Sequence, residues 1–111
     1  MSELDAENAK LVTLAKAARS RVGALQGAAV RDTTGRTYAS ANVNRPGLEL
    51  TAIELAVGQA FASGATGLEA VVLCSDEGFT AQDNKILSSS NSAVAGFHID
   101  LTGDVRGKTS F

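Results

Sequence analysis

The sequence predicts an α/β fold, a three-layer sandwich in which helices cover both faces of a mixed β-sheet. Three observations indicate it: apolar residues recur at helical spacing in two segments, a turn sequence joins two strand-like segments, and an unbroken apolar run follows the second helical segment. The predicted order is α-β-β-α-β-α-β, which favours a leading hairpin followed by crossover connections. At 111 residues, the chain is expected to form a single domain over residues 1–111.

The first predicted element is a helix over residues 3–20. Ser2 is a candidate N-cap, and the carboxylate of Asp5 lies three residues further on. Gly23 interrupts the helical pattern and should end the helix. The apolar face consists of Leu4, Leu11, Leu14, Ala15 and Ala18.

A β-hairpin is expected next, with strands over residues 25–31 and 36–43. Residues 32–35 read Asp-Thr-Thr-Gly. Asp and Thr side chains bond their own backbone in turns, and glycine tolerates a positive φ angle. Two strands around such a turn form an antiparallel pair.

The second predicted helix covers residues 48–63 and follows a loop at residues 44–47. The loop reads Asn-Arg-Pro-Gly, which is turn chemistry. Apolar residues of the helix again recur at helical spacing. Thr51 and Glu54 would form a capping pair if the helix begins late, and Gly64 should end it.

The C-terminal half alternates between strand and helix. Residues 68–74 form an apolar run typical of a strand buried on both faces. A short helix is expected over residues 80–87, then a polar linker over residues 88–92. Residues 97–101 alternate with period two, as a strand does, and residues 102–110 are polar, predicting a frayed end or a sheet edge.

Composition excludes several classes of function. The formal net charge is −2, the Lys and Arg residues are scattered, and there is no Trp, so nucleic-acid binding is not expected. No apolar run approaches the roughly 20 residues of a membrane span, and the acidic N-terminus does not read as a secretory signal. A single cysteine forms no intrachain disulfide, so the expected location is cytoplasmic.

Two segments resemble cytidine deaminases. Residues 27–44, GAAVRDTTGRTYASANVN, are similar to the family pattern GAAL-x-x-x-DGR-x-Y-x-G-x-NVEN, and residues 50–64 resemble the zinc-binding helix. The resemblance covers about half of the chain and implies the family fold, a zinc ion and a nucleoside substrate. It also implies that Asn42 and Asn44 lie where the family holds the ribose, while Ala24 replaces an aromatic residue beside the base. For Asn42 we favour a structural role, in which its side chain bonds backbone groups at the end of a strand, over ribose binding.

The residues that hold the zinc in the family are missing from this chain. By the resemblance, Thr51 stands at the first ligand position and Ile53 at the proton-shuttling glutamate. The paired cysteines of the family have no counterpart, because residues 77–87 contain no cysteine. The whole chain has one cysteine, Cys74, and one histidine, His98, too few for three N/S ligands in one protomer. We therefore predict no metal and no other cofactor.

The other candidate residues have structural explanations that we favour over functional ones. Cys74 is expected to be a small core residue. His98 alternates with Phe97 and Ile99, so it should lie on the opposite face from them, packed or facing solvent. Four carboxylates are expected to stabilise turns or helix N-termini: Glu49, Glu54, Asp76 and Glu77.

The sequence thus favours a non-catalytic protein of cytidine deaminase type, not an enzyme, that binds a nucleoside or serves as an interaction module. The alternative is a hydrolase acting on cytidine or a related amino-heterocycle through a non-standard site, and assembly with a true deaminase stays open. The resemblance implies a homo-oligomer, a dimer or a tetramer. Small residues on the second helix would permit close approach of another helix: Ala52, Ala56, Gly58 and Ala60.

Overall fold

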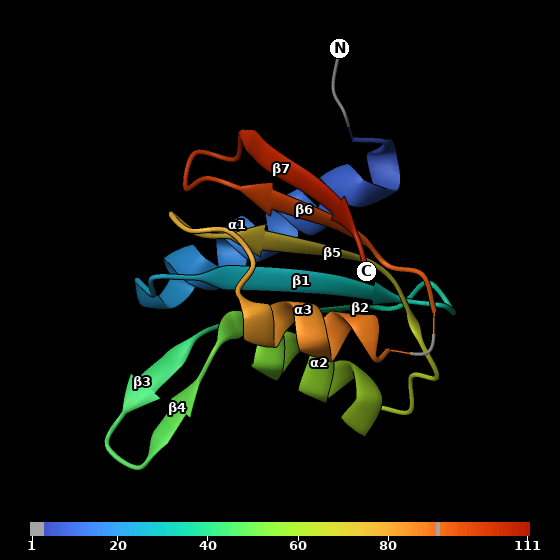
Figure 1. Cartoon of the computed structure of the whole chain (residues 1–111). Helices are drawn as coiled ribbons and strands as arrows, with labels where there is room; N and C mark the ends of the chain where they lie inside the picture. The colour runs from blue at the N-terminus through green and yellow to red at the C-terminus, as the bar shows by residue number, and fades with distance from the viewer. Residues whose placement is uncertain (1–3, 91) are drawn as a thin grey trace.

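A computed structural model describes residues 4–90 and 92–111 and confirms the three-layer α/β sandwich. A five-stranded sheet has the order β2-β1-β5-β6-β7, with α1 on one face and α2 and α3 on the other (Figure 1). A separate two-stranded sheet, β3-β4, stands out from the body. The elements are α1 (Ala6–Val22), β1 (Gly27–Asp32), β2 (Thr37–Ala41), β3 (Val43–Arg45), β4 (Leu48–Leu50), α2 (Ala52–Ala62), β5 (Leu68–Cys74), α3 (Ala81–Ser88), β6 (Ala95–Ile99) and β7 (Val105–Ser110).

The sheet is mixed, as expected. β5 lies at its centre and pairs antiparallel with β1 and parallel with β6, while the outer strands β2 and β7 are antiparallel to their neighbours. Six of the seven residues of β5 are buried. This burial explains the unbroken apolar run, because both faces of a central strand are covered by helices.

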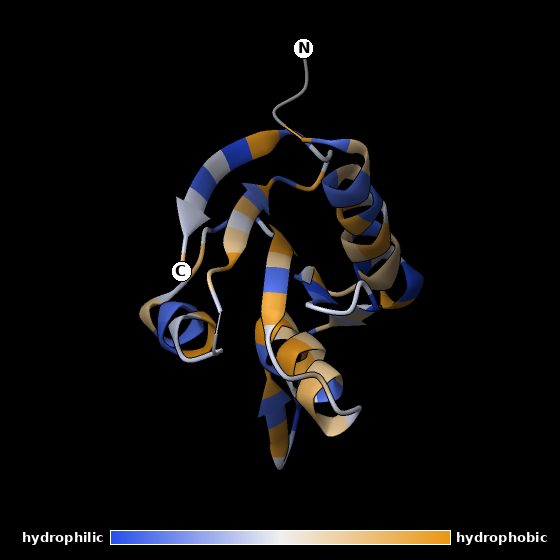
Figure 2. Ribbon diagram, turned by 90° about the vertical axis from the view of Figure 1, so that its right-hand side faces the viewer, coloured by the Kyte–Doolittle hydropathy of each residue, from blue (hydrophilic) through white to orange (hydrophobic). Residues whose placement is uncertain are grey.

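Two apolar clusters fill the spaces between the layers. One lies under α2 and α3 and includes Ile53, Val57 and Leu73, and the other lies under α1 and includes Leu11 and Phe97. Figure 2 shows the same layers from the side, with the hydropathy of each residue along the chain. In the described part of the chain, no helix is long and apolar enough to cross a membrane.

The first helix begins later than predicted. Asp5 is its N-cap, and the Asp5 side chain accepts a hydrogen bond from the backbone N–H of Asn8 (2.8 Å). Ser2, the predicted cap, lies outside the described residues. At the other end, Gly23 closes the helix with a φ of 64°, as predicted.

The second helix also begins later than predicted, because residues 43–50 form the β3-β4 hairpin in place of a loop and a first helical turn. Val43 pairs with Leu50, and Gly47 makes the turn with a φ of 83°. The helix begins at Ala52, immediately after its cap Thr51. Leu50 fits the apolar spacing of the predicted helix, but it is the last residue of β4.

The C-terminal segment forms an edge strand. β7 pairs with β6 along residues 105–110, so the polar residues lie at a sheet edge and are not frayed. The predicted linker at residues 88–92 is also more ordered than expected. Ser88 belongs to α3, Ser90 is buried, and Ser92 accepts a hydrogen bond from the N–H of Leu68 (2.9 Å), while Asn91 lies outside the described residues.

Candidate functional site

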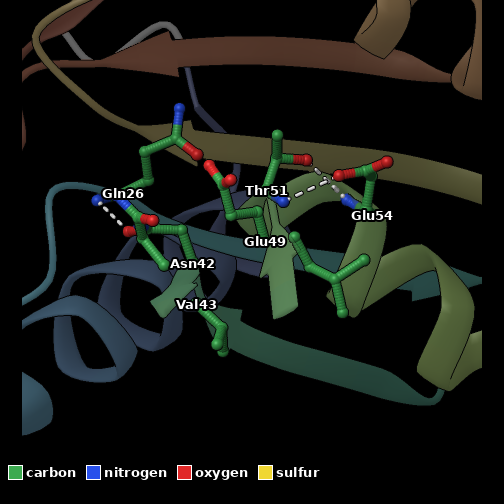
Figure 3. A pocket seen from close by; sticks show the side chains of 8 residues that line it. Gln26, Asn42, Val43, Glu49, Thr51 and Glu54 are labelled. Atoms are coloured by element: carbon green, nitrogen blue, oxygen red, sulfur yellow. Dashed lines mark hydrogen bonds between the residues drawn. The ribbon is translucent and has the colours of Figure 1, made fainter. Parts of the chain in front are cut away.

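A polar pocket lies between the β3-β4 hairpin and the N-terminus of α2. Its volume is about 200 Å³. Figure 3 shows side chains from the hairpin, from the start of α2 and from the residue before β1 directed toward one another. We call it the Asn42 pocket; its lining residues are Gln26, Asn42, Val43, Asn44, Glu49, Leu50, Thr51 and Glu54.

Asn42 and Gln26 together form one wall of the pocket. The Asn42 Oδ1 atom accepts a hydrogen bond from the Gln26 backbone N–H (2.9 Å), and the Asn42 N–H donates to the Gln26 carbonyl (3.3 Å). The side-chain Oε1 of Gln26 accepts from the N–H of Ala52 (3.3 Å). These bonds leave the amide NH₂ group of Asn42 available to a ligand.

Sequence reasoning missed Gln26, although the hairpin contains the signal for it. Pairs counted outward from the turn run from Arg31 with Thr37 to Gly27 with Ala41. The next pair in that register is Gln26 with Asn42. A prediction that extended the register by one residue would have placed an amide beside Asn42.

Asn44 and Glu49 face each other across the β3-β4 hairpin, where they are paired residues. Both are exposed. Neither side chain has a hydrogen bond or ion pair with another described residue, so the amide and the carboxylate are both available. Glu49 belongs to β4 and does not support the N-terminus of α2, which corrects the expected role.

Thr51 and Glu54 close the N-terminus of α2 with a capping box. The Thr51 Oγ1 accepts from the Glu54 N–H (3.0 Å), and the Glu54 carboxylate accepts from the Thr51 N–H (2.8 Å), as drawn in Figure 3. The predicted capping pair is thereby confirmed. Both side chains line the pocket while holding the helix end.

The capping box carries a testable consequence for stability. Substitution Thr51→Ala removes the acceptor for the Glu54 N–H and is expected to destabilise the protein by about 1 kcal/mol. The midpoint of urea unfolding measures the effect. Thr13→Ala, on the exposed side of α1, is the matched control; equal losses in the two variants would contradict a special role for Thr51.

Ile53 does not reach the pocket. Its side chain is fully buried in the cluster under α2. The residue that the resemblance assigns to the proton-shuttle position is therefore part of the core.

Asp76 and Glu77 lie beside the Asn42 pocket. A second hollow of about 340 Å³ is lined by Leu25, Ser75 and these two carboxylates, and it shares Gln26 and Asn42 with the first. Ser75 Oγ accepts from the Glu77 N–H (3.2 Å), a bond typical of a turn. The expectation of an acidic turn therefore holds, and the turn borders the pocket.

Cys74 and His98 are both engaged in the fold. Cys74 is fully buried, its thiol lies 3.5 Å from the Asp100 carbonyl, and burial raises the pKa of the thiol above its usual value. His98 is half-buried, with Nε2 2.8 Å from the carbonyl oxygen of Ser75. Neither residue lines the Asn42 pocket.

The three-layer α/β sandwich with a polar pocket at the start of α2 defines the fold class of the protein. The comparisons with known proteins define its family. A family model described as cytidine deaminase-like matches residues 4–103, so the chain belongs to the cytidine deaminase-like family. A search of curated protein sequences found no match.

Solved cytidine deaminases share the fold. The enzyme from Burkholderia pseudomallei is similar with a TM-score of 0.77 and 22% identity, over 99% of this chain and 93% of that one. A mutant from Mycobacterium tuberculosis gives 0.72 and 22%, over 85% and 87%. The enzyme from Mycobacterium leprae gives 0.66 and 20%, over 96% and 94%.

The comparisons correct one prediction. We predicted that the chain is not an enzyme, and that prediction is contradicted, because the matching family and the similar solved structures are cytidine deaminases, which are enzymes. Thr51 and Ile53 argue only against the usual zinc site of the family within one protomer. They are no evidence against catalysis by other residues.

The zinc ion that the family implies does not fit the residues of this protomer. Among residues 4–90 and 92–111, no three His, Cys, Asp or Glu side chains lie close enough to hold a metal. A tetrahedral site of N and S ligands needs at least three such groups. Thr51 is occupied in the capping box and Ile53 in the core.

Proposed function

We propose that this protein binds a nucleoside in the Asn42 pocket, with Asn42 and Asn44 bonded to ligand hydroxyl groups. The observation that carries the proposal is the convergence of three amides and one carboxylate on one pocket, from Gln26, Asn42, Asn44 and Glu49. Amide and carboxylate groups are suitable partners for ring hydroxyls. None of the lining residues is basic, which favours an uncharged nucleoside over a phosphate-bearing ligand.

The available atoms support distinct roles for these side chains. The NH₂ group of Asn42 donates to a ligand oxygen, because its Oδ1 is already bonded to Gln26. Asn44 offers both a donor and an acceptor, and the Glu49 carboxylate opposite it accepts from a hydroxyl or an amino group. The family resemblance, which implies a ribose beside Asn42 and Asn44, supports these roles.

A thermal-shift panel of cytidine, deoxycytidine, uridine and adenosine tests the proposal. Ligand at about 100 times its dissociation constant adds about 2.7 kcal/mol, which is several degrees for a domain of this size. We expect a shift with at least one nucleoside, reduced in Asn44→Ala and unchanged in Gln82→Ala, an exposed control on α3. A flat response across the panel, or equal shifts in both variants, would contradict nucleoside binding here.

Hydrolysis of cytidine or a related amino-heterocycle is a second candidate, and Glu49 favours it. Its carboxylate lies in the same pocket and has no partner among the described residues, so it is free to move protons. In hydrolytic deamination the water oxygen bonds to the ring carbon and ammonia leaves; Glu49 would take the water proton and pass it to the amino group. Ammonia release measures the reaction. Glu49→Gln should abolish turnover while keeping the thermal shift, and undiminished turnover in that variant would exclude Glu49.

We also propose a homo-oligomer in the cytosol, although α2 supports it less than expected. Ala52, Ala56 and Ala60 are buried within the protomer, so the small residues bring α2 close to the sheet and only Gly58 faces outward. Better support comes from the exposed Val22 and Leu25 (68% and 76% exposed), which border a hollow of about 450 Å³. A sedimentation mass of one protomer at micromolar concentration would contradict the oligomer.

A further inference from the structure

A separate pocket lies between α3 and the strands β6 and β7. Its volume is about 300 Å³, near the lower limit for small-molecule sites. It shares no residue with the Asn42 pocket and has no part in the proposed function. The loop after β5, the outer side of α3 and the strands β6 and β7 form it, and its lining residues are Gly78, Phe79, Asn84, His98, Gly107, Lys108 and Thr109.

His98 is the distinctive group in this pocket because one of its ring nitrogens is already engaged. The Nε2 atom lies 2.8 Å from the carbonyl oxygen of Ser75. A carbonyl oxygen only accepts, so Nε2 carries the proton, and in the neutral ring Nδ1 is left with a lone pair. The fold thus holds the ring in one tautomer and one orientation.

Gly78 keeps the Nδ1 atom accessible. A Cβ atom at residue 78 would lie 3.6 Å from Nδ1, in ordinary van der Waals contact. The missing side chain therefore leaves space beside the Nδ1 atom. His98 lines the pocket and is half-buried, so its Nδ1 acceptor is suited to a hydrogen-bond donor on a ligand.

Phe79 is the apolar wall of the pocket, and no charged side chain points into it. The Phe79 ring meets the Phe111 ring edge to face, with centroids 5.1 Å apart, which holds it in place as a flat wall. No lining residue is acidic. Lys108 contributes backbone only, since its ammonium lies on the opposite face of the sheet, 5.8 Å from the centroid of the Phe97 ring.

We propose that this pocket binds a small uncharged ring compound carrying an O–H or N–H donor, with the donor bonded to His98 Nδ1 and the ring against Phe79. Asn84 and Thr109 at the rim add polar contacts. The donor requirement follows from the fixed tautomer, and the ring requirement follows from the flat aromatic wall and the small volume.

Phenol and anisole are the probes, because they share a ring but only phenol has a donor. Nitrogen-15 NMR of the histidine ring at mildly alkaline pH measures the protonation of each ring nitrogen, and the signals do not overlap with others because the chain has a single histidine. Without ligand, the spectrum should report a proton on Nε2 and a lone pair on Nδ1. Phenol should shift the Nδ1 resonance, while anisole should bind about fivefold more weakly, the factor that one lost hydrogen bond carries.

Gly78→Ala is the variant that blocks Nδ1, and Gly58→Ala is its matched control on the exposed side of α2. Phenol should bind about fivefold more weakly to the first and normally to the second. A proton on Nδ1, no phenol-dependent shift, or a shift confined to the Asn42 side-chain amide would each overturn the proposal. The comparison of phenol with anisole on the unaltered protein decides the question even if Gly78→Ala fails to fold.

Discussion

Substitution Gly27→Ala is expected to destabilise the protein by about 3 kcal/mol, the upper range for overpacking, because the new methyl group has no space. Its Cβ would lie 2.1 Å from the carbonyl oxygen of Ala15 and 2.9 Å from the Cβ of Arg19. Both atoms belong to α1, whose backbone crosses directly over the first residue of β1. Accommodating the methyl group would require α1 to move away from the sheet.

Equilibrium unfolding in urea measures this loss as a lower midpoint at an unchanged slope. The matched control is Gly58→Ala, in the interior of α2, where an added Cβ would meet no atom within 4 Å. This variant should be neutral or gain up to about 1 kcal/mol, because alanine is the better helix former. A loss below about 1 kcal/mol for Gly27→Ala would contradict the close contact of α1 with β1.

The elements predicted best from the sequence are those whose signals are local. β5 was predicted at its observed bounds, Leu68–Cys74, because an unbroken apolar run at that length fits a central strand. α3 begins after Thr80, and Thr80 and Asp83 form a capping box like that of Thr51 and Glu54. A cap and its partner are three residues apart, so their pairing depends on little else.

The β3-β4 hairpin was not predictable in the same way. Each strand has three residues, too few for an alternating pattern, and Leu50 fits a helical face as well as it fits a strand. The Asn42 pocket depends on this hairpin, which carries Asn44 and Glu49. The sequence therefore identified two candidate binding residues, while the arrangement that brings Gln26 and Glu49 to them had to come from the structure.

The turn motif Asp-x-Thr-Gly occurs twice, at residues 32–35 and at residues 100–103, but only the first copy was predicted to be a turn. In each turn the Asp Oδ1 accepts from the N–H and the hydroxyl of the Thr, at 2.9 and 2.7 Å in the first and 3.0 and 2.6 Å in the second. The residue after the Gly also donates its N–H to the same oxygen, at 3.0 Å in both turns. The second motif would have predicted the β6-β7 hairpin.

Asp32→Ala is expected to destabilise the protein by about 3 kcal/mol, because four hydrogen bonds to one carboxylate are lost. Oδ1 accepts the three bonds of the turn, and Oδ2 accepts from the hydroxyl of Tyr38 (3.1 Å). The side chain is nearly inaccessible, at 2% exposed, so water replaces these bonds poorly. Asp100→Ala removes the same turn bonds and an exposed ion pair with Arg106 (2.7 Å), and it should cost less because Asp100 is more exposed. Equal losses would show that burial of Asp32 adds nothing.

The contribution of Asp32 to the free energy of unfolding should also depend on pH, in a direction set by the pKa of its carboxyl. Burial raises the pKa of this carboxyl, but the hydrogen bonds from Thr34, Arg36 and Tyr38 outweigh burial and hold the pKa below its usual 3.8. A carboxyl whose pKa is lower in the folded protein stabilises the fold at pH values above its unfolded pKa, and this stabilisation is lost as the pH falls through its folded pKa.

The Asp100 pKa is lowered too, first by the Thr102 hydroxyl, so the comparison is made in an Asp100→Ala background. In that background, the stability difference between Asp32 and Asp32→Ala should be constant near neutral pH and shrink below pH 3.8. A difference that stayed constant into strong acid would mean that the hydrogen bonds do not depend on the charge of Asp32.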